Sequence, residues 1–421
     1  MDKLIYDKTG RLLFTKEMKS HRTLLIPNML PLHGEIIANC LRLHGYKCEI
    51  LTTSHAAIKE QGLRYVHNDT CYPALLVIGQ FIDALKSGGY KREDTALLIT
   101  QTGGGCRASN YIHLLRKALK KAGYDDIPVV SLNLSGLEGN PGFKMSLTLL
   151  RQFIYAIMYG DILLLLSNQS RPYEINRGDT DKLVQGWYGK LTEIFKKPKN
   201  LTFKRMRENF KIIVRDFERL PRSQERKVRV GIVGEIYVKY SPLGNNDLEA
   251  YLLKEGAEPV VPGLADFLIF KIDNRDADVN LYGGLWLKQR VARLLKNYFK
   301  KCQNAMVEAI EQSEFRAPSR FEKIKELAMK YLGEGNKMGE GWLLTGEMLE
   351  LIHEGIPNIV CTQPFGCLPN HIVGKGMIRA LKTDHPEANI VAIDYDPGAT
   401  KINQENRVKL MLSNAALAVD S

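Results

Sequence analysis

Short apolar runs alternate with amphipathic segments along most of the chain, and this alternation constrains the fold more than any other feature. Residues 23–26 form such a run, and a loop then leads to residues 33–44, whose apolar side chains recur at helical spacing. The same order returns at residues 95–100 and again from residue 228 onward. Repeated strand, loop and helix is typical of a parallel sheet with right-handed crossovers. The sequence therefore predicts an α/β protein.

The 421 residues are enough for two domains, each with its own core. We expect a polar lead-in hairpin over residues 1–20 and a first α/β domain over residues 21–142. Helical periodicity then dominates residues 143–226, which we interpret as a connecting region that ends in a charged linker. A second α/β domain with a helical insertion is predicted over residues 227–421.

The net charge of +12 suits an anionic partner, such as a phosphate-rich cofactor, an acidic protein or nucleic acid. Nucleic acid is the minor alternative, because no helix-turn-helix or zinc-finger pattern accompanies the basic residues. The most apolar run, residues 153–166, is shorter than the roughly 20 residues that span a bilayer, and the N-terminus lacks a signal-peptide core. We expect a cytoplasmic protein without a membrane span, whose cysteines are reduced.

Four of the seven cysteines fall in loops that the pattern places at the carboxyl ends of strands: Cys71, Cys106, Cys361 and Cys367. Open α/β sheets bind ligands at that edge, so we expect the four thiols to meet at one site. Cys40 and Cys48 fall on a helix face and in a strand, where a small buried hydrophobe fits, and Cys302 lies in a basic helical stretch.

The spacing of the four loop cysteines distinguishes between two soft-metal centres. Thiolates select zinc or iron-sulfur clusters. Structural zinc sites usually contain two cysteine pairs, each with about two to four residues between the ligands. Here Cys361 and Cys367 form one wider pair, while the other two stand alone. This arrangement favours an iron-sulfur cluster between the domains, and zinc remains the alternative.

A glycine-rich turn precedes Cys106, and we expect Gly104, Gly105 and Arg107 to contact the cofactor. Glycine lets the backbone approach a cluster and direct amide N–H groups at its sulfurs, while the arginine would act through its charge. The alternative is a phosphate-binding turn at a helix N-terminus. That reading lacks the Lys-Ser/Thr of a P-loop and the spacing of a dinucleotide motif.

Three ionisable residues near these loops are candidates for proton transfer: His67, Glu235 and His371. Either histidine can equally serve as a helix cap or a packing residue. Glu235 follows the first strand of the second domain together with Tyr237, where it would contact a substrate or close the interface.

Four motifs together resemble the 2-hydroxyacyl-CoA dehydratase and benzoyl-CoA reductase subunit superfamily, over about residues 21–411. They are Asn-Asp-Thr-Cys-Tyr-Pro at Cys71, Gly-Gly-Gly-Cys-Arg at Cys106, Gly-Glu-Ile-Tyr at Glu235, and Cys-Thr-Gln-Pro-Phe-Gly-Cys-Leu-Pro-Asn-His-Ile from Cys361. The chain is most similar to the C-terminal, cysteine-containing region of large CoA-substrate-specific enzyme activase-like proteins. The resemblance implies two flavodoxin-like (Rossmann-like) parallel-sheet domains with a 4Fe-4S cubane between them. Its three ligands would be Cys71, Cys106 and Cys367.

Cys361 departs from that family pattern, because it would supply a fourth thiolate and close the cluster. A closed cluster favours electron transfer over chemistry at an open iron. Relatives with an 8Fe-9S double cubane use six cysteines per subunit. Cys40, Cys48 and Cys302 do not lie in corresponding loops, so a single cubane is preferred.

The chain has neither a P-loop nor the phosphate motifs of the actin-like ATPase fold, so an ATP-dependent activator would be a separate partner. We therefore expect an iron-sulfur protein that accepts low-potential electrons from such an activator for anaerobic reductive chemistry. The alternatives are an acyl-CoA dehydratase or reductase with substrate at an open iron, a double-cubane reductase of small molecules, and a zinc-stabilised binding protein. Family analogy suggests a homodimer.

Overall fold

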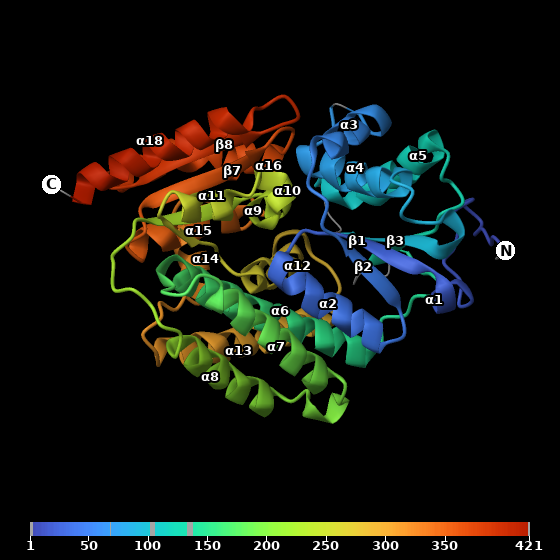
Figure 1. The fold of residues 1–421 in the computed structure, drawn as a ribbon, viewed down its shortest axis with the longest axis horizontal. Coiled ribbons are helices and arrows are strands. Elements are labelled where there is room, and N and C mark those ends of the chain that lie inside the picture. The colour runs from blue at the N-terminus through green and yellow to red at the C-terminus, as the bar shows by residue number, and fades with distance from the viewer. Residues whose placement is uncertain (1–2, 68, 102–105, 133–137, 420–421) are drawn as a thin grey trace.

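The structure, a computed structural model, describes residues 3–67, 69–101, 106–132 and 138–419. Within these residues the fold contains two four-stranded sheets, both entirely parallel, in the orders β2-β1-β3-β4 and β6-β5-β7-β8. The predicted α/β class with two parallel sheets is confirmed. In Figure 1 the first sheet lies on the right, the second lies at the upper left, and a layer of long helices runs below them.

The first domain follows the predicted alternation closely. Its strands are β1 (Thr23–Pro27), β2 (Lys47–Leu51), β3 (Thr95–Thr100) and β4 (Val129–Leu132). Its helices are α1 (Met18–His21), α2 (Pro31–Leu43), α3 (Ala56–Tyr65), α4 (Tyr72–Lys86) and α5 (Tyr111–Ala122). Before them, Tyr6 pairs with Leu12 in an antiparallel bridge around the turn at Gly10.

Helix α3 is absent from the sequence prediction, which placed only a loop between β2 and α4. Two glycines explain how this helix packs. A Cβ atom at Gly62 would collide with Leu75 of α4, and one at Gly79 would collide with the carbonyl of Ile58. Helices α3 and α4 therefore pack with their backbones in close contact at these two glycines. Because glycine has a low helix propensity, neither residue indicates a helix in the sequence.

The second domain carries the strands β5 (Arg229–Gly234), β6 (Glu258–Val260), β7 (Asn358–Pro364) and β8 (Asn389–Tyr395). The helices packed around this sheet are α9 (Ile236–Tyr240), α10 (Pro242–Asn245), α11 (Leu248–Lys254), α14 (Phe321–Met329), α15 (Trp342–His353), α16 (Leu368–Val373), α17 (Ile378–Asp384) and α18 (Lys401–Val419). The apolar run of residues 358–361 predicts a four-residue strand, and β7 extends three residues further. Thr362 and Gln363 end the apolar run in sequence, yet both are fully buried in the strand, and Thr362 Oγ1 donates to the Val233 carbonyl at 3.1 Å.

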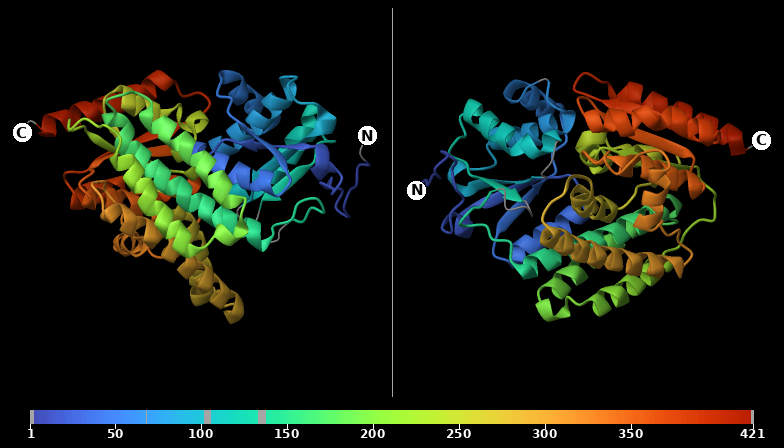
Figure 2. Two further views of the ribbon diagram at one scale, coloured as in Figure 1. Left: turned by 60° about the horizontal axis from the view of Figure 1, so that its bottom comes forward. Right: turned by 180° about the vertical axis from the view of Figure 1, so that it is seen from behind.

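Five long helices form the layer beneath the sheets: α6 (Leu147–Ser170), α7 (Asp179–Phe195), α8 (Phe203–Glu218), α12 (Leu264–Tyr282) and α13 (Trp286–Glu311). Helix α6 lies at the centre and packs against α2, α7, α8, α12 and α13. Helices α12 and α13 form a hairpin whose tip projects from the body, as Figure 2 shows on the left. The sequence predicts mostly helical structure over residues 285–332, whereas this insertion begins at Leu264, about 20 residues earlier.

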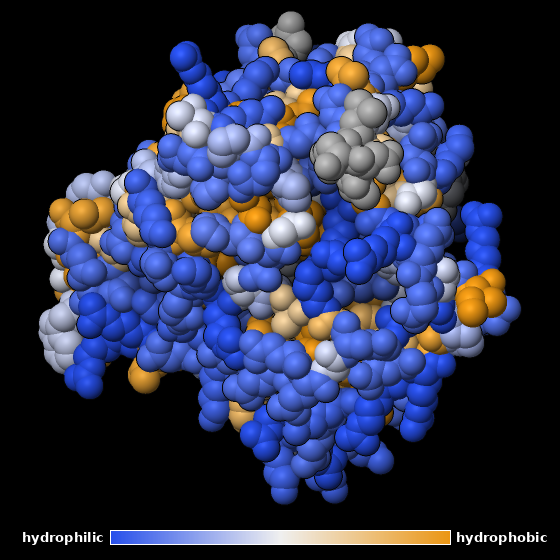
Figure 3. All heavy atoms as spheres, turned by 90° about the vertical axis from the view of Figure 1, so that its left-hand side faces the viewer, coloured by the Kyte–Doolittle hydropathy of each residue, from blue (hydrophilic) through white to orange (hydrophobic). Residues whose placement is uncertain are grey.

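The segment Leu147–Tyr173 is long and apolar enough to cross a membrane by length and composition, but 83% of its most apolar window is buried by protein. Its Asp161 carboxylate is fully buried and bonds His33 Nε2 at 2.8 Å and the backbone N–H groups of Leu264 and Ala265 at 2.7 and 2.8 Å. A bilayer supplies no such partners. We conclude that α6 is the core helix that joins α2 of the first domain to α12 of the second. The side of the molecule near the C-terminus is mainly hydrophilic (Figure 3).

Candidate metal centre

Three cysteines lie at the starts of short segments that face one another across the two domains. Cys71 precedes α4, and Cys106 precedes a 3-10 turn at Arg107–Asn110 that leads into α5. Cys367 precedes α16 of the second domain. Cys106 and Cys367 follow β3 and β7 as the sequence predicts, whereas Cys71 follows α3.

The Cys71 and Cys367 loops are in direct contact. The backbone N–H of Tyr72 donates to the Phe365 carbonyl at 3.0 Å, which joins the two domains by their main chains. Gly366 lies between Phe365 and Cys367, in the left-handed conformation at φ +73°, and a Cβ atom there would sit only 3.2 Å from the Cys71 Cα. This close approach requires the glycine.

Cys106 joins the same group. The guanidinium of Arg107 donates to the carbonyl of Asp69, two residues before Cys71. Burial raises the pKa of the Cys71 thiol to about 11, and burial also raises the pKa of the Cys367 thiol. Repulsion from an ionised Cys106 makes a small contribution to both shifts, so Cys106 lies within the range of charge interaction with both thiols. The structure thus places Cys71, Cys106 and Cys367 in one region of the fold, with the Cys71 and Cys367 loops in direct contact.

Two carboxyl groups lie beside the three thiols. Burial, followed by repulsion from Glu340, raises the pKa of Glu235 to about 8. Glu235 accepts from the Val238 N–H and Glu340 from the Ile236 N–H, both at 3.0 Å, so α9 holds both side chains in place. Glu235, a predicted candidate for proton transfer, thus lies within charge-interaction range of the three cysteines. Its raised pKa allows it to exchange a proton near neutral pH.

Tyr111 and Lys271 complete the surroundings. The Tyr111 hydroxyl lies 2.9 Å from Cys71 Sγ, and burial holds the pKa of this phenol well above its usual range, so the hydroxyl keeps its proton. Lys271 donates to the Gly339 carbonyl and is close enough to Cys106 and Glu340 for charge interaction, while burial lowers its pKa. The sequence analysis missed both residues and Glu340. Lys271 and Glu340 come from distant segments without a local motif, whereas Tyr111 lies five residues after Cys106 in a stretch with no distinctive spacing.

His67, His371 and Arg107 contact residues close to the cysteines in the chain. His67 is largely exposed and lies 3.4 Å from the Asp69 carboxylate. His371 Nδ1 lies 2.8 Å from the Cys367 carbonyl and 2.7 Å from Gln363 Nε2, so it braces the backbone of the loop. Arg107 contacts Asp69, and Gly104 and Gly105 lie outside the described residues.

The prediction that Cys361 lies in a strand-end loop with the other three thiols is wrong. Cys361 occupies the middle of β7, fully buried between Val233 of β5 and Ala392 of β8. It belongs to the hydrophobic core, where burial raises its pKa to about 12. The charged groups near Cys361 are Asp394, Glu347 and Lys375. The three loop thiols have different charged neighbours. Cys40 and Cys48 are buried as predicted, and Cys302 is buried as well.

Thiols are donors that soft metals and iron-sulfur clusters prefer. Within the described ranges, no three His, Cys, Asp or Glu side chains are close enough to hold a single metal ion. The side-chain amide of Asn370 and the phenol of Tyr237 are buried without a hydrogen-bond partner in this part of the chain, which buried polar groups rarely are.

Searches for similar proteins returned neither a matching family model nor a matching curated protein. The chemistry of the centre is therefore inferred from its own residues.

Proposed function

We propose that Cys71, Cys106 and Cys367 hold a 4Fe-4S cubane between two flavodoxin-like domains. The observation that supports this proposal is the contact between the Cys71 and Cys367 loops, which the 3.0 Å bond between Tyr72 N and Phe365 O joins, with Cys106 within charge-interaction range of both thiols. Thiolates are the ligands that iron-sulfur clusters prefer. The resemblance of the cysteine motifs to the dehydratase and reductase superfamily supports the same ligands.

The proposed role is to accept low-potential electrons from a separate ATP-dependent activator and pass them on in anaerobic reductive chemistry in the cytoplasm. The bound cluster would supply one-electron transfer. The chain's own residues set its environment: the Tyr111 hydroxyl is placed to donate to the Cys71 sulfur, and burial limits access of water. Hydrogen bonds to ligand sulfurs raise a cluster's potential.

A second candidate is a dehydratase or reductase that acts on an acyl-CoA or a small molecule at an open iron. Two observations favour it over a closed cluster. Cys361 is held within β7, which leaves three thiols at the centre, and Glu235 lies beside them with a pKa of about 8. A carboxyl group with this pKa can give or take a proton at physiological pH. The packing positions of Cys40, Cys48 and Cys302 support a single cubane over a double one.

Anaerobic purification followed by metal analysis tests the proposal. We expect about four irons and four sulfides per chain, with the charge-transfer absorption and reduced-state spin resonance of a cubane. Zinc in place of iron would contradict it and support the zinc-stabilised binding protein instead. Addition of an acyl-CoA separates the two roles: a change in the spin-resonance signal favours the open iron, and an unchanged signal favours electron transfer.

A further inference from the structure

Strand β8 is the last strand of the second sheet and pairs only with β7 within the described residues. The order β6-β5-β7-β8 corresponds to positions 2-1-3-4 of the doubly wound order 2-1-3-4-5. A fifth strand would lie against β8. The Asp394 carbonyl on this edge accepts from Gln404 Nε2 at 3.0 Å, and the other outward backbone groups are ones that a further strand can bind.

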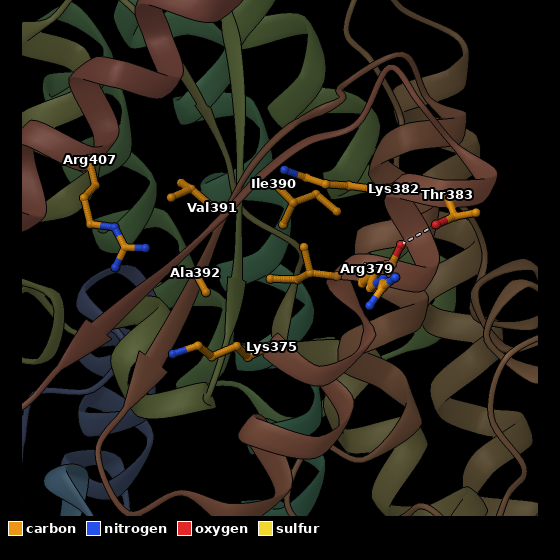
Figure 4. Close-up of a pocket in the computed structure, with 9 residues that line it drawn as sticks. Lys375, Arg379, Lys382, Thr383, Ile390, Val391, Ala392 and Arg407 are labelled. Atoms are coloured by element: carbon orange, nitrogen blue, oxygen red, sulfur yellow. Dashed lines mark hydrogen bonds between the residues drawn. The ribbon is translucent and has the colours of Figure 1, made fainter.

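A hollow of about 560 Å³ runs beside this edge (Figure 4). Three consecutive β8 residues line it: Ile390, Val391 and Ala392. Successive side chains of a strand point to opposite faces, so a hollow that reaches all three opens along the edge of the sheet. Ile390 and Ala392 pack on the α17 side, in the cluster that contains Leu381, and Val391 packs on the other side, which α18 covers.

Cationic side chains surround the hollow on both sides of the sheet. Lys375, Arg379 and Lys382 lie on the α17 side, and Arg407 comes from α18 (Figure 4). Lys375 pairs with Asp394 at 3.2 Å. Across the described chain no salt bridge forms with the other three, so their charges are available to an incoming anion.

We propose that the β8 edge binds an extended acidic segment of a partner protein, which adds to the sheet as a fifth strand. Strand addition satisfies the open backbone groups and gives affinity through the main chain. Acidic side chains at alternate positions would meet Arg379 and Lys382, while the intervening positions would meet Val391 and Arg407. The cations also repel basic strands and a second β8 edge, which makes the edge selective.

An elongated ligand fits this hollow better than a single phosphate group does. One phosphate is bound by cations that converge on a point, whereas these cations belong to two helices on opposite faces of one strand. The site involves none of the three thiols. The test of this site is therefore independent of the test of the proposed cluster.

The test uses the full chain and a fluorescein-labelled peptide, Glu-Val-Glu-Val-Glu-Val-Glu. We expect saturable binding by anisotropy, at least about tenfold weaker in the Arg379→Glu/Lys382→Glu variant and strongly weakened by salt. The Lys117→Glu/Lys120→Glu variant changes the net charge by the same amount at two exposed positions on α5 and should bind like the wild type. Lys382→Glu alone provides a second variant if the first does not fold, and it should also weaken binding.

Two further measurements distinguish strand addition from simple charge attraction. A peptide with proline in place of each valine keeps the charge but lacks those N–H groups, so it should bind at least about tenfold more weakly. Hydrogen exchange should slow at the amides of Asn389–Tyr395 when the valine peptide binds. Equal binding of the two peptides, or displacement by inorganic pyrophosphate without slowed exchange, would overturn the proposal in favour of a small-anion site. Absence of any binding would also overturn it.

Discussion

Replacing Gly366 with alanine tests the contact between the two cysteine loops. Gly366 has φ +73°, where an L-residue costs about 1–2 kcal/mol. Its new Cβ would also press on the Cys71 Cα at 3.2 Å, so one loop must move. Overpacking of this kind costs about 1–3 kcal/mol. We expect Gly366→Ala to lose about 2–5 kcal/mol in total, the sum of the two effects.

Gly355→Ala is the matched control. Gly355 has φ +72° at the end of α15, and a Cβ atom there would meet nothing within 4 Å. The control therefore measures the backbone cost alone, about 1–2 kcal/mol. Anaerobic urea unfolding, followed by circular dichroism, gives the difference between the variants. Iron release to a chelator gives a second readout, and we expect faster release from Gly366→Ala only. Equal stability and equal iron release in the two variants would refute the loop contact.

Two further predictions concern buried charges away from the thiols. Lys239→Met leaves the buried Glu347 without its ion-pair partner, which lies 2.8 Å away. We expect this variant to lose about 3–5 kcal/mol in the free energy of unfolding, measured in urea. The double variant Lys239→Met/Glu347→Leu should recover most of that loss. A loss below about 1 kcal/mol in the single variant would contradict this. Burial raises the pKa of Asp266 to about 7 from 3.8, so the folded state binds the proton more tightly than the unfolded state. Proton binding by Asp266 therefore contributes on the order of 4 kcal/mol to the free energy of unfolding. This contribution is fully present below about pH 4 and is lost as the pH rises to 7. Asp266→Asn should reduce the decrease in the free energy of unfolding between pH 4 and pH 7, measured by urea unfolding. An unchanged pH dependence would contradict the raised pKa of Asp266.

Local pattern was sufficient to predict most of the fold. The eight strands fall where short apolar runs precede loops, because a parallel strand buried on both faces needs such a run. Pattern failed where tertiary packing decides the structure. Thr362 and Gln363 extend β7 because neighbouring strands bury and pair them, and α3 depends on contact between Gly62 and α4.

The candidate site shows the same division. Cys71, Cys106 and Cys367 are recognisable because each begins a helical segment after a loop with distinctive residues. Cys361 resembles them in sequence, yet strand pairing places it in the core. Glu340 and Lys271 reach the site from the insertion between β6 and β7, and no spacing in the sequence connects them to the cysteines.

The iron content of four alanine variants tests the central claim most directly. Cys71→Ala, Cys106→Ala, Cys367→Ala and Cys361→Ala would be purified anaerobically and their iron and sulfide measured per chain. The first three should lose most of their iron, because each removes a ligand. Cys361→Ala should keep it, because this thiol packs in the core of β7. Full iron in the Cys367 variant, or loss confined to the Cys361 variant, would contradict a centre held by the three loop thiols.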